Sequence, residues 1–543
     1  MKRLDQTPRI TRRRLIARLV GAGAICNFPL TRAISNVGAG AAVASTTYGG
    51  IRGIVANDVL SFRGVPYGGS ADGLNRFRPP SKPTPWKGVR DATKAGPRAM
   101  QASTETIFGS PLIGSYFSGG RKDALGITAE PNSENCLVLN VITPALRGQR
   151  PVMVYIHGGG LDALSGALTL ISDRFVAEQD VVVVGVNHRL NVFGYTYLGG
   201  LDAAYPDSGN VGQLDLIAAL KWVRDNIENF GGDPSNVTLF GESAGGGKIS
   251  TLLAMPGTKG LFHRAIIESG SFLLKVRDPE TATEDTKKLL SRLGLGASQV
   301  GELWRLSTDK LLSAYSSTAG HGGPVVDGRS LPHQTWASGA PPEAAGVSLI
   351  IGSCKDETTL FSLDDAALFS LDWPTLRDRQ IKAGIPENKV DTLLSAYRAD
   401  YPLDSPSDLY FRIASDRGFR RNAISQAEAK LRQGRGDVYM YYFEWDTRLG
   451  DGRLRAFHTA ELPLAMRLVA NPQAEELSKQ IAGAWAAFAR RGDPNHPGLP
   501  HWQRYSLEQR ATITFDAGKT ALVRNPAEQE LALLAPFAEV FPN

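Results

Sequence analysis

Residues 237–250 read VTLFGESAGGGKIS, and this stretch decides the fold. Residues 237–240 form a short apolar run that predicts a buried strand, and the small residues after Ser243 predict the start of a helix. The five residues GESAG (241–245) match G-x-S-x-G, a sharp turn that holds a serine hydroxyl out at the edge of a sheet. Glycines two residues to either side relieve the crowding that such a turn creates.

Two other structures could use the same residues. A glycine-rich turn that packs a helix closely against a sheet would need small residues at the same places. A phosphate-binding loop follows G-x-x-x-x-G-K-[ST], and Gly247-Lys248 is a partial match to it. Its first glycine would have to stand where Glu242 is, and Ile249 occupies its Ser/Thr position. The sequence therefore excludes the phosphate loop, whereas the plain turn stays open on this stretch alone.

The elements around this stretch alternate between strands and helices. Residues 152–156 and 181–186 are nearly unbroken apolar runs, typical of strands that are covered on both faces. Residues 214–230 place apolar side chains along one stripe and predict a helix. This order predicts an α/β fold with a large, mostly parallel central sheet flanked by helices. Strands are further expected at 47–55, 59–65, 137–142, 236–240, 265–268, 347–352, 438–445 and 512–515, and helices at 244–255, 283–293, 423–433 and 475–490.

A second glycine-rich segment, HGGG (157–160), directly follows the strand expected at 152–156. Backbone N–H groups of such a loop can approach a substrate closely and stabilise negative charge that develops on a carbonyl oxygen. We expect Gly159, Gly160 and Ala244 to supply these N–H groups. A flexible turn is the alternative, and it is less consistent with the G-x-S-x-G turn that follows further along the chain.

A reactive serine needs a base and an acid that orients it. The chain has eight histidines, and in hydrolases with a G-x-S-x-G turn the order is serine, acid, histidine. His458 is the best candidate base, because the other histidines precede the serine or lie in loops, beside prolines or at a helix–strand junction. The acid is expected just after the strand at 347–352, where spacing does not choose between Asp356 and Glu357.

Longer motifs are spread in order over nearly all of residues 45–543. They are FRGVPY (62–67), RFRPP (76–80), ENCLVLN (134–140), NHRL (187–190), GNVG (209–212) and FGESAGG (240–246). Together they resemble the type-B carboxylesterase family, the cholinesterase-like branch of the α/β-hydrolases, and indicate a bacterial exported member. The resemblance implies an α/β-hydrolase fold in which loop and helix insertions form the substrate gorge.

The resemblance also assigns the catalytic residues and the reaction. It implies Ser243 as the nucleophile, Glu357 as the acid and His458 as the base. The implied function is a serine carboxylesterase that hydrolyses small-molecule carboxylic esters through an acyl-enzyme on Ser243, with no metal or cofactor. The alternatives are a non-catalytic adhesion or scaffold protein on the same fold, or an amidase or carbamate hydrolase with the same three residues. A lipase would need a large apolar lid, which the loop at 104–128 could hold.

Two ion pairs are implied as structural, Arg76 with Glu134 and Arg189 with Asp215. The sequence also departs from the family pattern. The family often pairs the cysteine of ENCL with one near residues 96–100, which read GPRAM here, so that Cys136 is expected to stay reduced.

Further departures concern the substrate pocket and the acid loop. In the family the residue after Gly160 is usually Phe, whereas this chain has Leu161 followed by Asp162. These two residues change a wall of the substrate pocket. We expect Glu242 to line the same pocket. Thr358 replaces the usual glycine after the acid. These differences concern which substrate fits and leave the expected reaction unchanged.

The N-terminus carries the basic charge of the chain. Residues 1–44 hold eight basic side chains and one acidic one, whereas the whole chain has a net charge of only +6, so the remainder is close to neutral. This distribution excludes an electrostatic case for nucleic-acid binding. TRRRLI (11–16), an apolar run and AVA (42–44) predict a twin-arginine-like export signal, cleaved before residue 45, and a periplasmic or secreted enzyme. The apolar run is too short for a membrane anchor, and residues 45–543 are expected to form a single catalytic domain.

Overall fold

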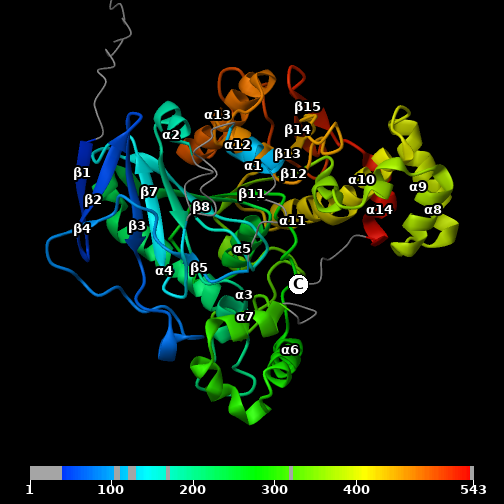
Figure 1. The fold of residues 1–543 in the computed structure, drawn as a ribbon. Helices are drawn as coiled ribbons and strands as arrows, with labels where there is room; N and C mark the ends of the chain where they lie inside the picture. Colours follow the sequence, from blue (N-terminus) through cyan, green and yellow to red (C-terminus); the bar gives the residue numbers. More distant parts are fainter. Residues whose placement is uncertain (1–39, 103–110, 120–129, 167–171, 317–321, 538–543) are drawn as a thin grey trace, which may run out of the picture. The chain divides into compact units, whose positions relative to one another are not determined.

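The computed structural model describes residues 40–102, 111–119, 130–166, 172–316 and 322–537. A 13-stranded sheet runs through these residues (Figure 1). In spatial order it contains β1 (Gly40–Thr46), β2 (Gly49–Ala56), β3 (Val59–Pro66), β7 (Val138–Thr143), β9 (Val182–Val186), β8 (Arg150–Ile156), β10 (Gly232–Glu242), β11 (Arg264–Glu268), β12 (Ser348–Cys354), β13 (Val438–Phe443), β14 (Ala511–Phe515) and β15 (Ala521–Arg524), while β4 (Val89–Asp91) pairs with β2.

The centre of the sheet is parallel, and its two margins are antiparallel apart from the parallel pairing of β4 with β2. The strands from β9 through β8 and β10 to β14 pair in parallel, whereas β1, β2, β3 and β7 pair antiparallel, as do β14 and β15. Parallel strands are covered on both faces, and every residue of β9 is buried. This arrangement confirms the predicted α/β-hydrolase fold.

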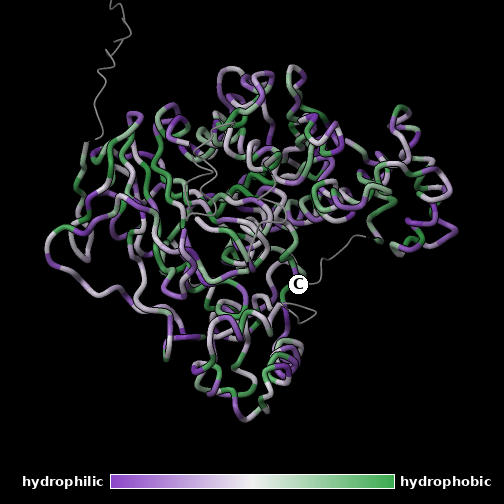
Figure 2. Tube along the Cα trace, viewed as in Figure 1, coloured by the Kyte–Doolittle hydropathy of each residue, from purple (hydrophilic) through white to green (hydrophobic). Residues whose placement is uncertain are grey.

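Alternate residues of the central strands belong to two different hydrophobic cores. Val152 and Val154 of β8 pack into a core with residues of α4 (Val211–Asn226), α5 (Ala244–Leu252) and α11 (Arg421–Arg432). Met153 and Tyr155, which point the other way, pack into a second core with residues of α2 (Asp173–Gln179) and α13 (Glu475–Arg491). In Figure 2 the hydrophobic stretches accordingly follow the strands, while α6 (Pro279–Arg292) is largely hydrophilic. Helices on both faces therefore hold the central strands in place.

The sequence predicts the sheet better than the peripheral helices. The helix expected at 214–230 is α4 followed by a 3-10 turn, and the strand expected at 236–240 begins earlier, at Gly232. No elements were predicted for α8 (Trp373–Lys382), α9 (Glu387–Asp400) and α10 (Pro406–Ser415), which share a small core of their own with α14 (Glu528–Leu534) (Figure 1). These helices are rich in polar residues, and their apolar side chains pack mainly on one another.

The described part of the chain begins inside the predicted leader. Ala44, the residue before the expected cleavage point, is buried in β1 and pairs with Ile51 of β2. Cleavage after Ala44 stays a prediction, and it would separate residues 40–44 from the sheet. Within the described ranges, no helix has both the length and the apolar character needed to cross a membrane. Most of the loop at 104–128, apart from α1 (Pro111–Phe117), lies outside those ranges.

Candidate active site

Ser243 lies on the turn between β10 and α5. Its backbone has φ 56° and ψ −129°, a conformation that non-glycine residues rarely adopt. Its N–H donates a hydrogen bond of 2.8 Å to the carbonyl oxygen of Glu268 at the end of β11. Such strain is maintained only where the surrounding structure determines it, and it is concentrated at functional sites.

The glycines of this turn are required by the close approach of β8. A Cβ atom on Gly241 or Gly245 would collide with the carbonyl oxygen of Ile156, the last residue of β8. In the loop that follows β8, a Cβ atom on Gly158 would lie 2.8 Å from the carbonyl oxygen of Glu242 and 3.2 Å from the Cβ of Ser243. The loop at 157–160 therefore lies directly against the serine.

His458 and Glu357 are in direct contact. Nδ1 of His458 lies 2.5 Å from Oε2 of Glu357, and both side chains are buried. Oε1 of Glu357 accepts hydrogen bonds from the N–H of Cys354, at 2.7 Å, and from Oγ of Ser269, at 2.6 Å. Asp356, the other candidate acid, instead accepts a hydrogen bond from the N–H of Ala456. Of the two acids, only Glu357 contacts the histidine.

The second ring nitrogen of His458 faces the residue before the serine. Nε2 lies 3.2 Å from Oε1 of Glu242, and the described hydrogen bonds of His458 do not include Ser243. Hydrogen bonds between a base and its nucleophile are often long or misaligned before substrate binds. The structure thus brings Glu357, His458 and Glu242 into one contact group next to Ser243, and their roles stay predictions.

Four buried glutamates interact with one another here, and two of them, Glu242 and Glu357, contact the base. Burial first, and then the charges of the neighbouring glutamates, raise the pKa of Glu242 well above its ordinary value. Burial and the charge of Glu461 raise the pKa of Glu268 to about 8, although Nε1 of Trp485 donates a hydrogen bond to it. Burial and the charge of Glu357 also raise the pKa of Glu461, which accepts a hydrogen bond from the hydroxyl of Tyr441. At neutral pH the group therefore holds protons, because four adjacent carboxylates do not all ionise in a buried site.

Two aromatic rings cover the base. The rings of Phe361 and Phe419 have their centroids 5.0 and 5.1 Å from the imidazole of His458. Phe419 is buried, whereas Phe361 is 55% exposed, which is unusual for a phenylalanine. An exposed apolar ring beside the base is suited to contact with an apolar part of a substrate.

The glycine loop and a buried lysine lie on the other side of Ser243. Gly159 and Gly160 have φ of 81° and 64°, and Ala244 is the first residue of α5, where helix N–H groups have no partner within the helix. Nζ of Lys248, on the same helix, donates a 3.0 Å hydrogen bond to the carbonyl oxygen of His157, directly before the glycines. Burial lowers the pKa of Lys248 to about 7.

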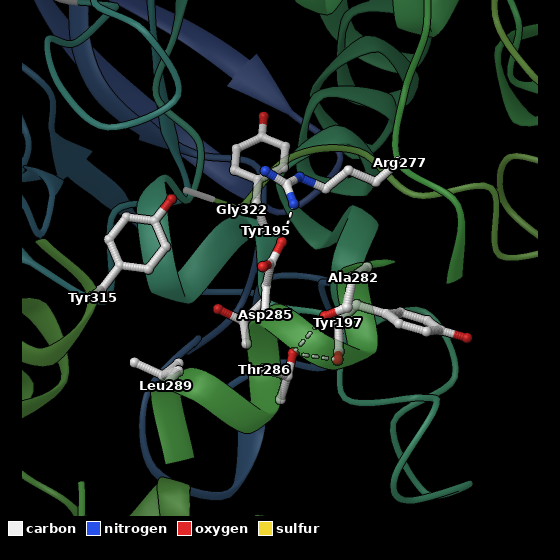
Figure 3. A pocket seen from close by; sticks show the side chains of 10 residues that line it. Tyr195, Tyr197, Arg277, Ala282, Asp285, Thr286, Leu289, Tyr315 and Gly322 are labelled. Atoms are coloured by element: carbon white, nitrogen blue, oxygen red, sulfur yellow. Dashed lines mark hydrogen bonds and ion pairs between the residues drawn. The ribbon is translucent and has the colours of Figure 1, made fainter. Parts of the chain in front are cut away.

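Leu161 and Asp162 lie next to this loop. Leu161 packs with Tyr195 and Leu273, while the negative charge of Asp162 raises the pKa of Lys248 and so opposes the effect of burial. Beyond Tyr195, a cavity of about 30 Å³ opens between Tyr315, Gly322 and the helix α6, and contains none of the three expected catalytic residues (Figure 3). It has room for about two water molecules, so it is not a substrate pocket.

Both implied ion pairs are confirmed. Nη2 of Arg76 lies 2.5 Å from Oε1 of Glu134, and Nη2 of Arg189 lies 2.6 Å from Oδ1 of Asp215. Cys136 is a buried free thiol, as predicted. Among the described residues, no group of three or more histidine, cysteine or acidic side chains is arranged to hold a metal ion.

Several residues of the site were not identified from the sequence. Glu461 is the third residue after His458, and this spacing within a helical turn could have identified it. Ser269, Phe361, Phe419 and Lys248 come from four other segments, and no local pattern marks them. Only the folded chain shows that they contact the expected catalytic residues or the glycine loop.

Comparison with known proteins gives a consistent result along the chain. Residues 40–534 match the sequence profile of the Carboxylesterase family. The para-nitrobenzyl esterase of Bacillus subtilis (strain 168) is 33% identical over 511 residues, which cover 90% of this chain and 97% of the relative. The liver carboxylesterase of Sus scrofa is 34% identical, over 84% of this chain and 85% of the relative.

Solved structures agree with the sequence relatives. The crystal structure of a carboxylesterase from Geobacillus stearothermophilus at pH 6.2 is similar with a TM-score of 0.77 and 36% identity, over 91% of this chain and 99% of that one. A PNB esterase structure has a TM-score of 0.74 and 32% identity, over 91% of this chain and 99% of that one. The chain therefore belongs to the carboxylesterase family and is a carboxylic ester hydrolase.

Proposed function

We propose that this carboxylesterase hydrolyses small-molecule esters through an acyl-enzyme on Ser243, with His458 as the base and Glu357 as its orienting acid. The main support is the 2.5 Å contact between Nδ1 of His458 and Oε2 of Glu357, beside the strained turn of Ser243. A carboxylate at Nδ1 fixes the tautomer of the imidazole and leaves Nε2 to accept a proton.

In the proposed reaction His458 removes the proton of the Ser243 hydroxyl as its oxygen attacks the ester carbonyl. The C=O bond opens to an oxyanion, which accepts hydrogen bonds from the N–H groups of Gly159, Gly160 and Ala244. When the intermediate collapses, the C–O bond to the alcohol breaks and His458 gives its proton to the leaving oxygen. Water then attacks the acyl-enzyme by the same route and releases the acid.

The buried glutamates have a proposed role in this cycle. The imidazolium that forms at His458 carries a positive charge on a buried side chain. Glu242 lies 3.2 Å from its Nε2, and Glu357 lies at Nδ1. Negative charge on Glu357 favours the imidazolium and so lowers the energy of the transition state, while a protonated Glu242 offers its carbonyl oxygen as an acceptor to the Nε2–H. Leu161 and Asp162, next to the glycine loop, are the proposed wall of the substrate pocket.

Hydrolysis of a short-chain p-nitrophenyl ester tests the proposal. We expect Ser243→Ala to lower kcat by at least about a thousandfold, because the nucleophile is lost. Ser235→Ala, an exposed serine at the other end of β10, is the matched control and should retain full activity. Undiminished turnover by correctly folded Ser243→Ala would exclude Ser243 as the nucleophile.

An amidase or carbamate hydrolase with the same residues is the alternative reaction. Matched ester and amide substrates that share their acyl group distinguish the two, and we expect the ester to be hydrolysed faster. A preference for the amide would overturn the proposed substrate class. The proposed periplasmic or secreted location is tested separately by N-terminal sequencing of the exported protein, which should begin at residue 45.

A further inference from the structure

A second pocket is lined by residues of α11, β13, β14 and α14. Its volume is about 330 Å³, within the range of small-molecule sites. None of the three expected catalytic residues, Ser243, Glu357 and His458, lines this pocket. Its lining includes three arginines, Arg420, Arg421 and Arg510, which come from two separate segments of the chain.

Three residues that line this pocket each carry a buried polar atom for which the described part of the chain offers no hydrogen-bond partner. These atoms are Nε of Arg421, Nε of Arg510 and the hydroxyl of Tyr442. The two arginine atoms can only donate, and a tyrosine hydroxyl can donate as well. Buried donors without acceptors cost free energy, so a pocket that collects three of them is suited to a ligand rich in acceptor oxygens.

The lining carries three arginines against two acidic side chains, Glu428 and Glu528, so that its net charge favours an anion. Arg510 donates a 2.7 Å hydrogen bond to Glu428, and Arg420 lies 3.4 Å from Asp416 and stacks on the ring of Tyr442. Arg421, by contrast, forms no ion pair with any residue that the structure describes. Guanidinium groups bind the planar oxygen pair of a carboxylate in a bidentate manner, and they keep their charge at any physiological pH.

The rest of the lining is apolar. Ile424, Met440 and Leu531 face the same pocket as the arginines. An inorganic anion would leave this surface without contact, whereas an aromatic or short aliphatic carboxylate would cover it. We propose that this pocket binds small organic carboxylates, with the carboxylate on Arg421 and Arg510 and the apolar body against these three side chains. The site does not depend on the chemistry proposed for Ser243.

The neighbouring backbone also distinguishes this place. Arg420 ends a five-residue π-helical turn, Asp416–Arg420, and Phe419 in the same turn packs on His458. Single π turns in helices are rare and occur frequently at functional sites. The turn therefore directs Phe419 towards His458 and the next residue, Arg420, towards the second pocket.

Isothermal titration of the full chain with benzoate tests the proposal. The Ser243→Ala background is used, so that the result does not depend on turnover. We expect saturable binding, weakened about ten- to a hundredfold by Arg421→Gln, because a charged donor is lost. Tyr442→Phe, which removes one donor and keeps the ring, should weaken binding by a smaller factor. Arg305→Gln is the matched control, because Arg305 is an exposed arginine outside the pocket, and it should bind as the parent does.

Four results would overturn the proposal. They are absence of saturable benzoate binding, unchanged affinity in both pocket variants, an equal loss in Arg305→Gln, and inorganic phosphate binding as tightly as benzoate. Thermal melting of each variant shows that it is folded before titration. Because Arg421 has no ionic partner in the described chain, we expect Arg421→Gln to melt within a few degrees of the parent.

Discussion

Two groups of buried ionisable residues flank Ser243, one of them acidic and the other basic. On the side of the base, Glu242, Glu268, Glu357 and Glu461 form an acidic group around His458. On the side of the glycine loop, Lys248 donates to the carbonyl oxygen of His157, whose ring lies 4.6 Å from that of His188. The side chains of both groups are buried, and burial disfavours the charged form of each.

The acidic group retains protons, whereas the basic group loses them. Burial raises the pKa of Glu242, Glu268 and Glu461 and lowers the pKa of Lys248, His157 and His188. In acyl transfer the base becomes positive and the substrate oxygen becomes negative. The acidic side chains beside His458 and the basic side chain behind the glycine loop are each of the type that stabilises the charge expected to develop next to them. The division of charge across Ser243 is therefore consistent with the proposed reaction.

The largest expected effect comes from the acidic side. Glu357→Gln should lower kcat by about ten-thousandfold with little change in KM, because the neutral amide no longer stabilises the imidazolium or fixes its tautomer. Steady-state kinetics on a p-nitrophenyl ester measure it. Asp356→Asn is the neighbouring control, since Asp356 is equally buried but bonds to the backbone of Ala456, and it should affect melting temperature more than kcat. Equal losses of kcat in the two variants would contradict the assignment of Glu357.

The basic side should contribute less. We expect Lys248→Met to lower kcat about ten- to a hundredfold, because the glycine loop loses an anchor and a nearby positive charge. The matched control is Lys430→Met, since Lys430 is another buried lysine that donates to backbone carbonyls, at 2.6 Å to Ala344, but does so away from the site. If both lysine variants lose stability and neither loses kcat, Lys248 is only structural.

The two groups should also oppose each other in the dependence of stability on pH. Between pH 4.5 and about 8 the folded chain keeps a proton on Glu268 that the unfolded chain releases, so rising pH destabilises the fold. Between about pH 7 and 10.5 the unfolded chain holds a proton that Lys248 has lost in the fold, so rising pH stabilises it. Glu268→Gln should therefore gain about 1–3 kcal/mol relative to wild type between pH 5 and 8. Denaturant unfolding at both pH values measures this difference, and a gain that is independent of pH would contradict it.

The sequence predicts one of these groups better than the other. The acidic group includes motif residues such as Glu242 and Glu357, whose neighbours in the chain mark a turn or a strand end. Lys248 was considered only as part of an excluded phosphate loop, because a lysine in a helix is usually exposed. Its burial and its bond to His157 depend on how closely α5 approaches β8, which no local pattern encodes. The same holds for α8, α9 and α10, whose apolar side chains form a core with one another and with α14.

The smallest expected effect concerns Phe361, the exposed ring that packs on His458. Phe361 is 55% exposed and packs on His458, whereas Phe419 packs on the same imidazole from a buried position. Phe361→Ala should lower kcat/KM for a benzoyl ester by about two- to fivefold, since the apolar ring offers contact area that alanine lacks. For an acetyl ester, which is too small to cover the ring, the change should be smaller. Trp373→Ala, another exposed aromatic residue, is the control and should change neither rate. An equal loss for both esters would instead place the effect of Phe361 on the base itself, because only a change at His458 would lower the two rates alike.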